Sequence, residues 1–242
     1  MSIKTEVSFW KSLYHIGAIA PLVAIVFYLT EMFSIILGAA VEPYPSSVED
    51  WYTLFQHNKL IGLLYFNALD VFSIAFLGVM FLALYVALKE FDPSLMIIAT
   101  FFALLGVVVF VLPRAALLAV LPLSDKYAAA ATAAQRTQML AAGEALNSLG
   151  AATPQTMGFF FMAVAVMVIS VVMLRSESFS KATAYIGLVA GILTIADDLS
   201  VMFVPALASI LMPVSGLFWL IWWVLVSRGL FRLARITLGE SK

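Results

Sequence analysis

Residues 182–203 read ATAYIGLVAGILTIADDLSVMF, an apolar run with two adjacent acids, Asp197 and Asp198, towards its end. A membrane-spanning helix needs about 20 predominantly apolar residues, and this run is long enough to be one. Charged side chains are costly within the bilayer, so those that occur there mark functional sites by default. The stretch therefore predicts a membrane helix and the first candidate site.

Comparable apolar runs recur along the whole chain, which is 64% hydrophobic and only 11% charged. A soluble domain carries about 25% charged residues. We therefore predict an all-α fold: a polytopic membrane helix bundle with six transmembrane helices, forming a single membrane domain over residues 1–242. The predicted spans are residues 13–38, 60–88, 94–121, 154–174, 182–203 and 206–226.

Two stretches between the spans are predicted to lie outside the membrane core. Residues 124–153 are alanine-rich, with Gly143 and Gly150 as breaks, and favour an extracytoplasmic helical segment between the third and fourth helices. Residues 41–58 contain Trp51 and Tyr52, which prefer the membrane–water interface.

The distribution of Lys and Arg predicts the orientation, because cytoplasmic loops are enriched in these residues. With six spans, nine lie on the side of the termini and three on the other. We therefore expect both termini in the cytoplasm. The nine are Lys4, Lys11, Lys89, Arg175, Lys181, Arg228, Arg232, Arg235 and Lys242; the three are Lys59, Lys126 and Arg136.

The unusual polar residues of the spans are expected to share the outer half of the membrane. At a rise of about 1.5 Å per residue, Glu31, Arg114 and Asp198 lie roughly 24–30 Å from the cytoplasmic edge. Asp70 lies about 15 Å below the opposite edge, near the midplane, with Asn67 on the same helical face.

These residues predict an outward-facing, acid-rich intramembrane pocket. Intramembrane ionisable groups usually face the bundle interior and pair with one another, and one guanidinium can hold one carboxylate and touch a second. The remaining acids would then attract a small cationic or amphiphilic ligand. The predicted ligand-binding residues are Asp70, Asp198, Asp197, Arg114, Glu31 and Asn67.

The residue inventory excludes several other chemistries. The chain has no cysteine and two histidines, so thiolate sites and a three-histidine zinc site are impossible. It has no buried lysine for retinal and no nucleotide-binding fingerprint. We predict no cofactor and no metal centre, although a hard-cation site among the same acids is chemically permissible. The net charge of −1 argues against nucleic acid, which leaves the lipid bilayer as the one general partner.

A family resemblance appears in the segment from Ser124 to Leu146, which includes SDKYAAA, AQR and LAAGEAL. This segment, together with TAYIGLVAG at residues 183–191, resembles a bacterial multi-span membrane family catalogued only as a domain of unknown function. The resemblance implies a protein of about six spans in the bacterial inner membrane. It implies no activity and no catalytic residues.

Three functions remain open from the sequence. The leading one is binding or transport of a small cationic or amphiphilic ligand, with transport the weaker part because the cytoplasmic half is almost purely apolar. An intramembrane enzyme could instead use paired carboxylates as proton donor and acceptor on a lipid-like substrate. A structural or accessory subunit would need the polar residues only for packing, with Arg114 extending to the headgroups and Asp197 or Asp198 at a frayed helix end.

Overall fold

A computed structural model describes residues 3–38, 42–150 and 153–236 of the chain, and these residues form ten helices and no strand. Six of the helices are long and apolar enough to cross a membrane, which confirms the predicted all-α bundle. The helices are α1 (Ile3–Gly38), α2 (Val48–His57), α3 (Lys59–Tyr65), α4 (Ala68–Leu88), α5 (Pro93–Leu117), α6 (Val120–Ala128), α7 (Ala133–Gly150), α8 (Thr153–Arg175), α9 (Lys181–Phe203) and α10 (Pro205–Ile236).

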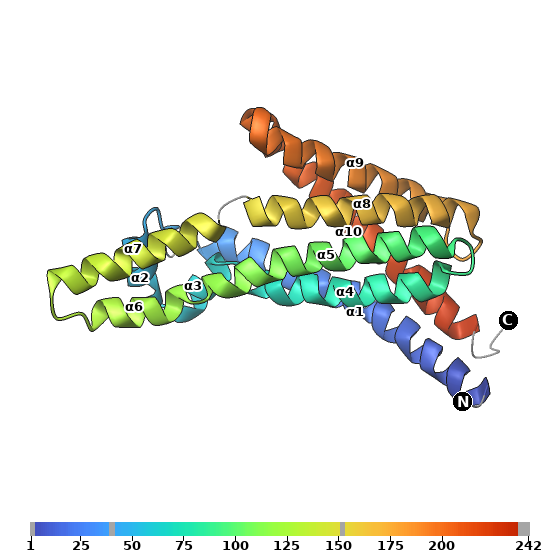
Figure 1. The fold of residues 1–242 in the computed structure, drawn as a ribbon, viewed down its shortest axis with the longest axis horizontal. Coiled ribbons are helices and arrows are strands. Elements are labelled where there is room, and N and C mark those ends of the chain that lie inside the picture. Colours follow the sequence, from blue (N-terminus) through green and yellow to red (C-terminus); the bar gives the residue numbers. More distant parts are fainter. Residues whose placement is uncertain (1–2, 39–41, 151–152, 237–242) are drawn as a thin grey trace.

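The six long helices form a closed ring. Helix α1 packs against α4 and α10, α4 packs against α5, α5 against α8, α8 against α9, and α9 against α10. Helix α1 begins and α10 ends at the same end of the molecule (Figure 1), as an even number of spans requires. The main hydrophobic core fills this ring, with Leu77, Met80, Met162 and Trp222 among its fully buried side chains.

Small residues allow a close helix crossing between α5 and α8. A Cβ atom placed on Gly106 would lie 2.7 Å from the carbonyl oxygen of Gly158 and 2.7 Å from Cγ of Met162. Membrane helices associate through such close backbone approaches, because lipid provides no hydrophobic drive between helices. Gly106 and Gly158 therefore allow α5 and α8 to pack in direct contact within the ring.

The four short helices α2, α3, α6 and α7 form a cap at the end of the bundle opposite the start of α1 (Figure 1). The cap has a hydrophobic core of its own, in which Trp51, Tyr52, Phe55 and Tyr65 are buried. The Tyr52 hydroxyl donates a 2.6 Å hydrogen bond to the Met139 carbonyl and so fixes α7 against α2. The third span runs into this cap through α6.

The sequence dictates where the cap's first helix begins. Ser47 and Asp50 form a capping box, in which the Ser47 hydroxyl accepts from the Asp50 amide and the Asp50 carboxylate accepts from the Ser47 amide. The Ser46 hydroxyl also donates to this carboxylate, at 2.8 Å. These hydrogen bonds to the charged form lower the pKa of Asp50 below its ordinary value of 3.8.

The predicted helix over residues 60–88 is divided into two helices, α3 and α4. Asn67 separates them with φ 54°, in the left-handed region that asparagine tolerates better than most residues. The break arises because Tyr65 and Phe66 belong to the cap core, whereas α4 belongs to the bundle. Asp70 consequently lies in the first turn of α4, and not within a single helix that begins at residue 60.

Candidate functional site

The candidate site begins on the inward face of α9, where small residues allow close packing. A Cβ on Gly191 would lie 3.0 Å from the Ala163 carbonyl of α8, so α8 and α9 are in backbone contact there. One turn later, Thr194 accepts a 2.7 Å hydrogen bond from Nε1 of Trp219 on α10. Asp198 follows at the next turn of the same face.

Asp198 is the last charged side chain that the bundle buries on α9. It is 7% exposed, whereas the side chains of residues 201–207 are all exposed. Helices α9 and α10 run antiparallel, so Ser215, one turn from Trp219, lies level with Asp198. Beyond this level the connected ends of α9 and α10 separate from the rest of the bundle (Figure 1); we call residues 199–214 the hairpin tip.

Adjacent helix residues point about 100° apart, and the two acids of α9 accordingly differ: Asp198 is buried and Asp197 is half-buried. Oδ2 of Asp198 and Oδ1 of Asp197 are both buried without a hydrogen-bond partner. Oδ1 of Asn67 is in the same state. Nearly all buried polar atoms in proteins are satisfied, so three buried acceptors without donors require an explanation.

A second polar group joins α1, α4 and α5. Glu31 is 4% exposed, and its Oε1 accepts a 2.6 Å hydrogen bond from the Leu69 amide. Its carboxyl group also lies close enough to that of Asp70 for the two to interact, and Asp70 lies within electrostatic reach of Arg114. The Arg114 guanidinium carbon lies 5.5 Å from the centre of the Phe110 ring. This group therefore has the internal partners that the α9 acids lack.

The Tyr28 side chain lies between the two groups. Its hydroxyl oxygen is 3.6 Å from the position that a Cβ on Gly216 would occupy, beside Ser215 on α10. The same phenol is within electrostatic reach of Asp70 on α4. Tyr28 thus connects the level of Asp198 with the Glu31–Asp70 pair.

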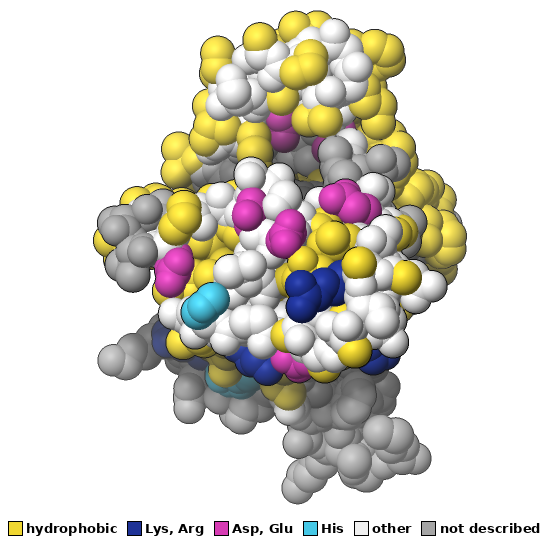
Figure 2. Space-filling view, turned by 90° about the vertical axis from the view of Figure 1, so that its left-hand side faces the viewer, with side chains coloured by type: hydrophobic (Ala, Val, Ile, Leu, Met, Phe, Trp, Pro, Cys, Tyr) yellow, Lys and Arg dark blue, Asp and Glu magenta, His cyan; other side chains and the backbone are white. Residues whose placement is uncertain are grey.

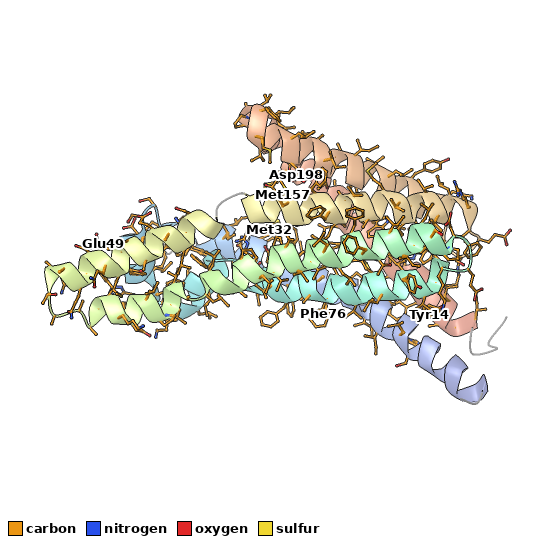
Figure 3. The ribbon with its side chains drawn as sticks, viewed as in Figure 1. Tyr14, Met32, Glu49, Phe76, Met157 and Asp198 are labelled. Carbon is orange, nitrogen blue, oxygen red and sulfur yellow. The ribbon has the colours of Figure 1, made fainter. Side chains whose placement is uncertain are left out.

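The molecular surface is hollowed between the hairpin tip and the cap. Figure 2, which faces the cap, shows acidic side chains within a hollow between the hairpin tip and the cap. Figure 3 shows Met32, Met157 and Asp198 at similar positions along the long axis of the molecule. Met32 and Met157 are both exposed, so the bundle surface at this level is apolar there.

The structure therefore distributes the six predicted residues between two groups. Glu31, Asp70 and Arg114 interact with one another, whereas the charge that acts on Asp198 comes from Asp197. Asn67 is the cap residue of α4, three positions before Asp70. Among the described residues, no three His, Asp or Glu side chains cluster closely enough to hold a metal ion.

Sequence reasoning missed Tyr28, Thr194 and Trp219. Thr194 and Asp198 are i and i+4 on one face of α9, a spacing that could have linked them. Tyr28 and Trp219 carry no such local signal, because their role depends on which helices become neighbours in the ring.

The fold and these polar groups define a six-span, all-α membrane protein with charged residues inside its bundle. A model of the family described as "Domain of unknown function (DUF4386)" matches residues 24–227, and the chain belongs to this family. This confirms the predicted resemblance to a membrane family catalogued as a domain of unknown function. A comparison with curated proteins finds no match, and neither does a comparison with solved structures.

Proposed function

We propose that this protein binds a small cationic amphiphile, with the charged head beside Asp198 and the tail along the apolar hairpin tip. The observation that carries the proposal is the pair of buried carboxylate oxygens, on Asp197 and Asp198, that have no donor. An ionised carboxylate in a low-dielectric setting is strongly unfavourable unless a positive charge or hydrogen-bond donors face it. An ammonium head supplies both.

The surroundings favour an amphiphile over a fully polar cation. Leu199, Met202 and Phe203 follow Asp198 directly and are 49%, 50% and 77% exposed. An acyl or alkyl chain that extends from the Asp198 level would contact these side chains. The hollow lies between the hairpin tip and the cap, so a ligand could enter it from the lipid or from the cap side (Figure 2).

We further propose that the protein resides in the bacterial inner membrane with both termini cytoplasmic and the cap outside. The excess of Lys and Arg on the side of the termini supports this orientation, by nine to three. The hollow would then be accessible from the outer side, as the sequence predicts for the acid-rich pocket.

Native mass spectrometry of the gently purified protein tests the binding proposal. We expect a co-purifying mass in the wild type that is lost in Asp198→Asn and retained in Asp125→Asn. Asp125 is a matched control because it lies in the cap, where its carboxylate is 3.3 Å from Nζ of Lys59. A mass retained in Asp198→Asn would refute the assignment of Asp198 to the ligand.

A second function, acid–base catalysis, is favoured by one observation, the closeness of the Glu31 and Asp70 carboxyl groups, which interact with one another. Two interacting carboxyl groups can share one proton, which is the arrangement of a general acid and general base pair. Under this alternative, Asp70→Asn would leave amphiphile binding unchanged and abolish turnover of a lipid-like substrate. If Asp70→Asn only lowers stability, the pair serves to hold α1 against α4, as in an accessory subunit.

A further inference from the structure

A separate cavity lies between the start of α9 and the second half of α10, at the end of the bundle away from the cap (Figure 1). Its volume is about 350 Å³. The side chains that line it combine two guanidinium groups and two hydroxyl groups with one apolar side chain. The lining residues are Ser180, Thr183, Leu225, Arg228, Gly229 and Arg232.

The wall of this cavity is held in place by specific contacts. Nη2 of Arg232 donates a 2.6 Å hydrogen bond to the Ser178 carbonyl, which fixes the turn before α9 against α10. The Phe179 ring packs where Gly229 lacks a side chain, since a Cβ there would lie 2.5 Å from the ring. Arg228, Gly229 and Arg232 are i, i+1 and i+4 on α10, so both guanidinium groups reach the same cavity.

The charge around the cavity is positive. No Asp or Glu lines it; the acid nearest to it in sequence is the exposed Glu177, three residues before Ser180. Lys181, the first residue of α9, adds a further cation at the same end. Arg228 is exposed, and it makes no hydrogen bond or ion pair with the described residues. Arginine forks match phosphate oxygens in charge and geometry, and the amides at the start of α9 add positive potential.

We propose that this cavity binds a phosphate group, between the Arg228 and Arg232 guanidinium groups. The Ser180 and Thr183 hydroxyls are hydrogen-bonded to each other at 2.8 Å, which leaves one of the two hydroxyl hydrogens as an additional donor, and Leu225 forms the apolar wall on the side of the bundle. Basic pockets between transmembrane helices suit anionic phospholipid headgroups, and a free phosphate offers the same chemistry. This site is independent of the acids on α9 and does not rest on the cationic ligand proposed for them.

Titration of the purified full-length protein with phospholipids, followed by native mass spectrometry, tests this site. We expect dioleoylphosphatidylglycerol to bind at least tenfold more tightly than dioleoylphosphatidylcholine. Loss of one charged hydrogen-bonding group should weaken phosphatidylglycerol binding about tenfold in Arg228→Gln. Arg235→Gln is the control, because Arg235 is exposed on the same helix but does not line the cavity, and it should bind as the wild type does.

Competition with inorganic phosphate identifies the source of the group. Displacement of the lipid by millimolar phosphate would assign the site to a free anion, and no displacement would assign it to a lipid headgroup. Arg228→Gln is preferred to a change at Arg232, which also holds the Ser178 carbonyl and supports the fold. The proposal is overturned if folded Arg228→Gln binds phosphatidylglycerol as tightly as the wild type, or if the wild type does not prefer it.

Discussion

The contact between α5 and α8 gives a quantitative prediction for Gly106→Ala. The added Cβ would lie 2.7 Å from the Gly158 carbonyl oxygen and 2.7 Å from Cγ of Met162. A normal contact is about 3.5 Å or longer, so the helices must separate by about 0.8 Å. The Gly158 carbonyl belongs to a helix backbone and cannot rotate away. We expect overpacking to lower the free energy of unfolding by about 1–3 kcal/mol, offset by up to about 1 kcal/mol of helix propensity.

Gly78→Ala provides the matched control, because it makes the same chemical change in a buried helix without a clash. A Cβ on Gly78 would lie 3.8 Å from the nearest atom, a Val107 methyl carbon, which is an ordinary contact. Gly78→Ala should therefore be neutral or stabilising, and its free energy of unfolding should be about 1–3 kcal/mol higher than that of Gly106→Ala. Unfolding by sodium dodecyl sulfate in mild detergent, followed by tryptophan fluorescence, measures both. Equal stability of the two variants would refute the proposed close crossing.

Three further predictions concern the cap and the orientation. Tyr52→Phe removes the hydrogen bond to the α7 backbone, so the cap should lose about 1 kcal/mol of stability and the amide hydrogens of α7 should exchange faster. Unchanged exchange would show that this hydrogen bond does not hold α7 in place. The pKa of Asp50 is lower in the folded protein than in the unfolded chain. The stability that its carboxylate contributes should therefore be complete above pH 3.8 and be lost as the pH falls through the lower pKa of the folded state. Amide hydrogen exchange of α2 should therefore become faster at low pH in the wild type than in Asp50→Asn, relative to neutral pH. Parallel pH profiles of the two proteins would argue against this role of Asp50. Because the chain contains no cysteine, a single cysteine can be placed in the cap by Thr137→Cys or at the opposite end by Glu177→Cys. A membrane-impermeant maleimide should label only Thr137→Cys in intact cells. Labelling of Glu177→Cys alone would show that the protein has the opposite orientation.

The membrane bundle could be predicted from the sequence because bilayer thickness fixes the length of each apolar run. The cap could not be predicted as a unit. Its core joins residues 48–66 to residues 117–146, and the pairing of short helices so distant in sequence leaves no local pattern. The break at Asn67 was hidden for the same reason, since residues 60–88 form one continuous apolar run although Tyr65 packs in the cap.

The residues of the candidate site were found by their polarity, but their grouping was not. The position of Glu31 and Asp198 along their helices follows from helical rise, which is insensitive to the tertiary fold, and their depth in the membrane stays a prediction. The position of Asp70 depended on where its helix begins, and counting from residue 60 placed it too far from the helix end. Which acids become partners depends on the order of helices around the ring, and Tyr28 on α1 enters the site only through that order.

The acid pair on α9 is proposed to recognise a positive charge on an amphiphile. The most direct measurement is the binding of dodecyltrimethylammonium and dodecyl sulfate to the protein in phosphatidylcholine nanodiscs, with Asp198→Asn and Asp70→Asn alongside. Because partitioning into lipid is common to all three proteins, differences among them report the site itself.

We expect saturable binding of the cation, and not of the anion, to the wild type. Loss of the charged partner at Asp198 should weaken cation binding about tenfold to a hundredfold. Asp70→Asn should retain binding, because Asp70 is already engaged with Glu31 and lies near Arg114. Equal binding of the cation to the wild type and to folded Asp198→Asn would contradict the account.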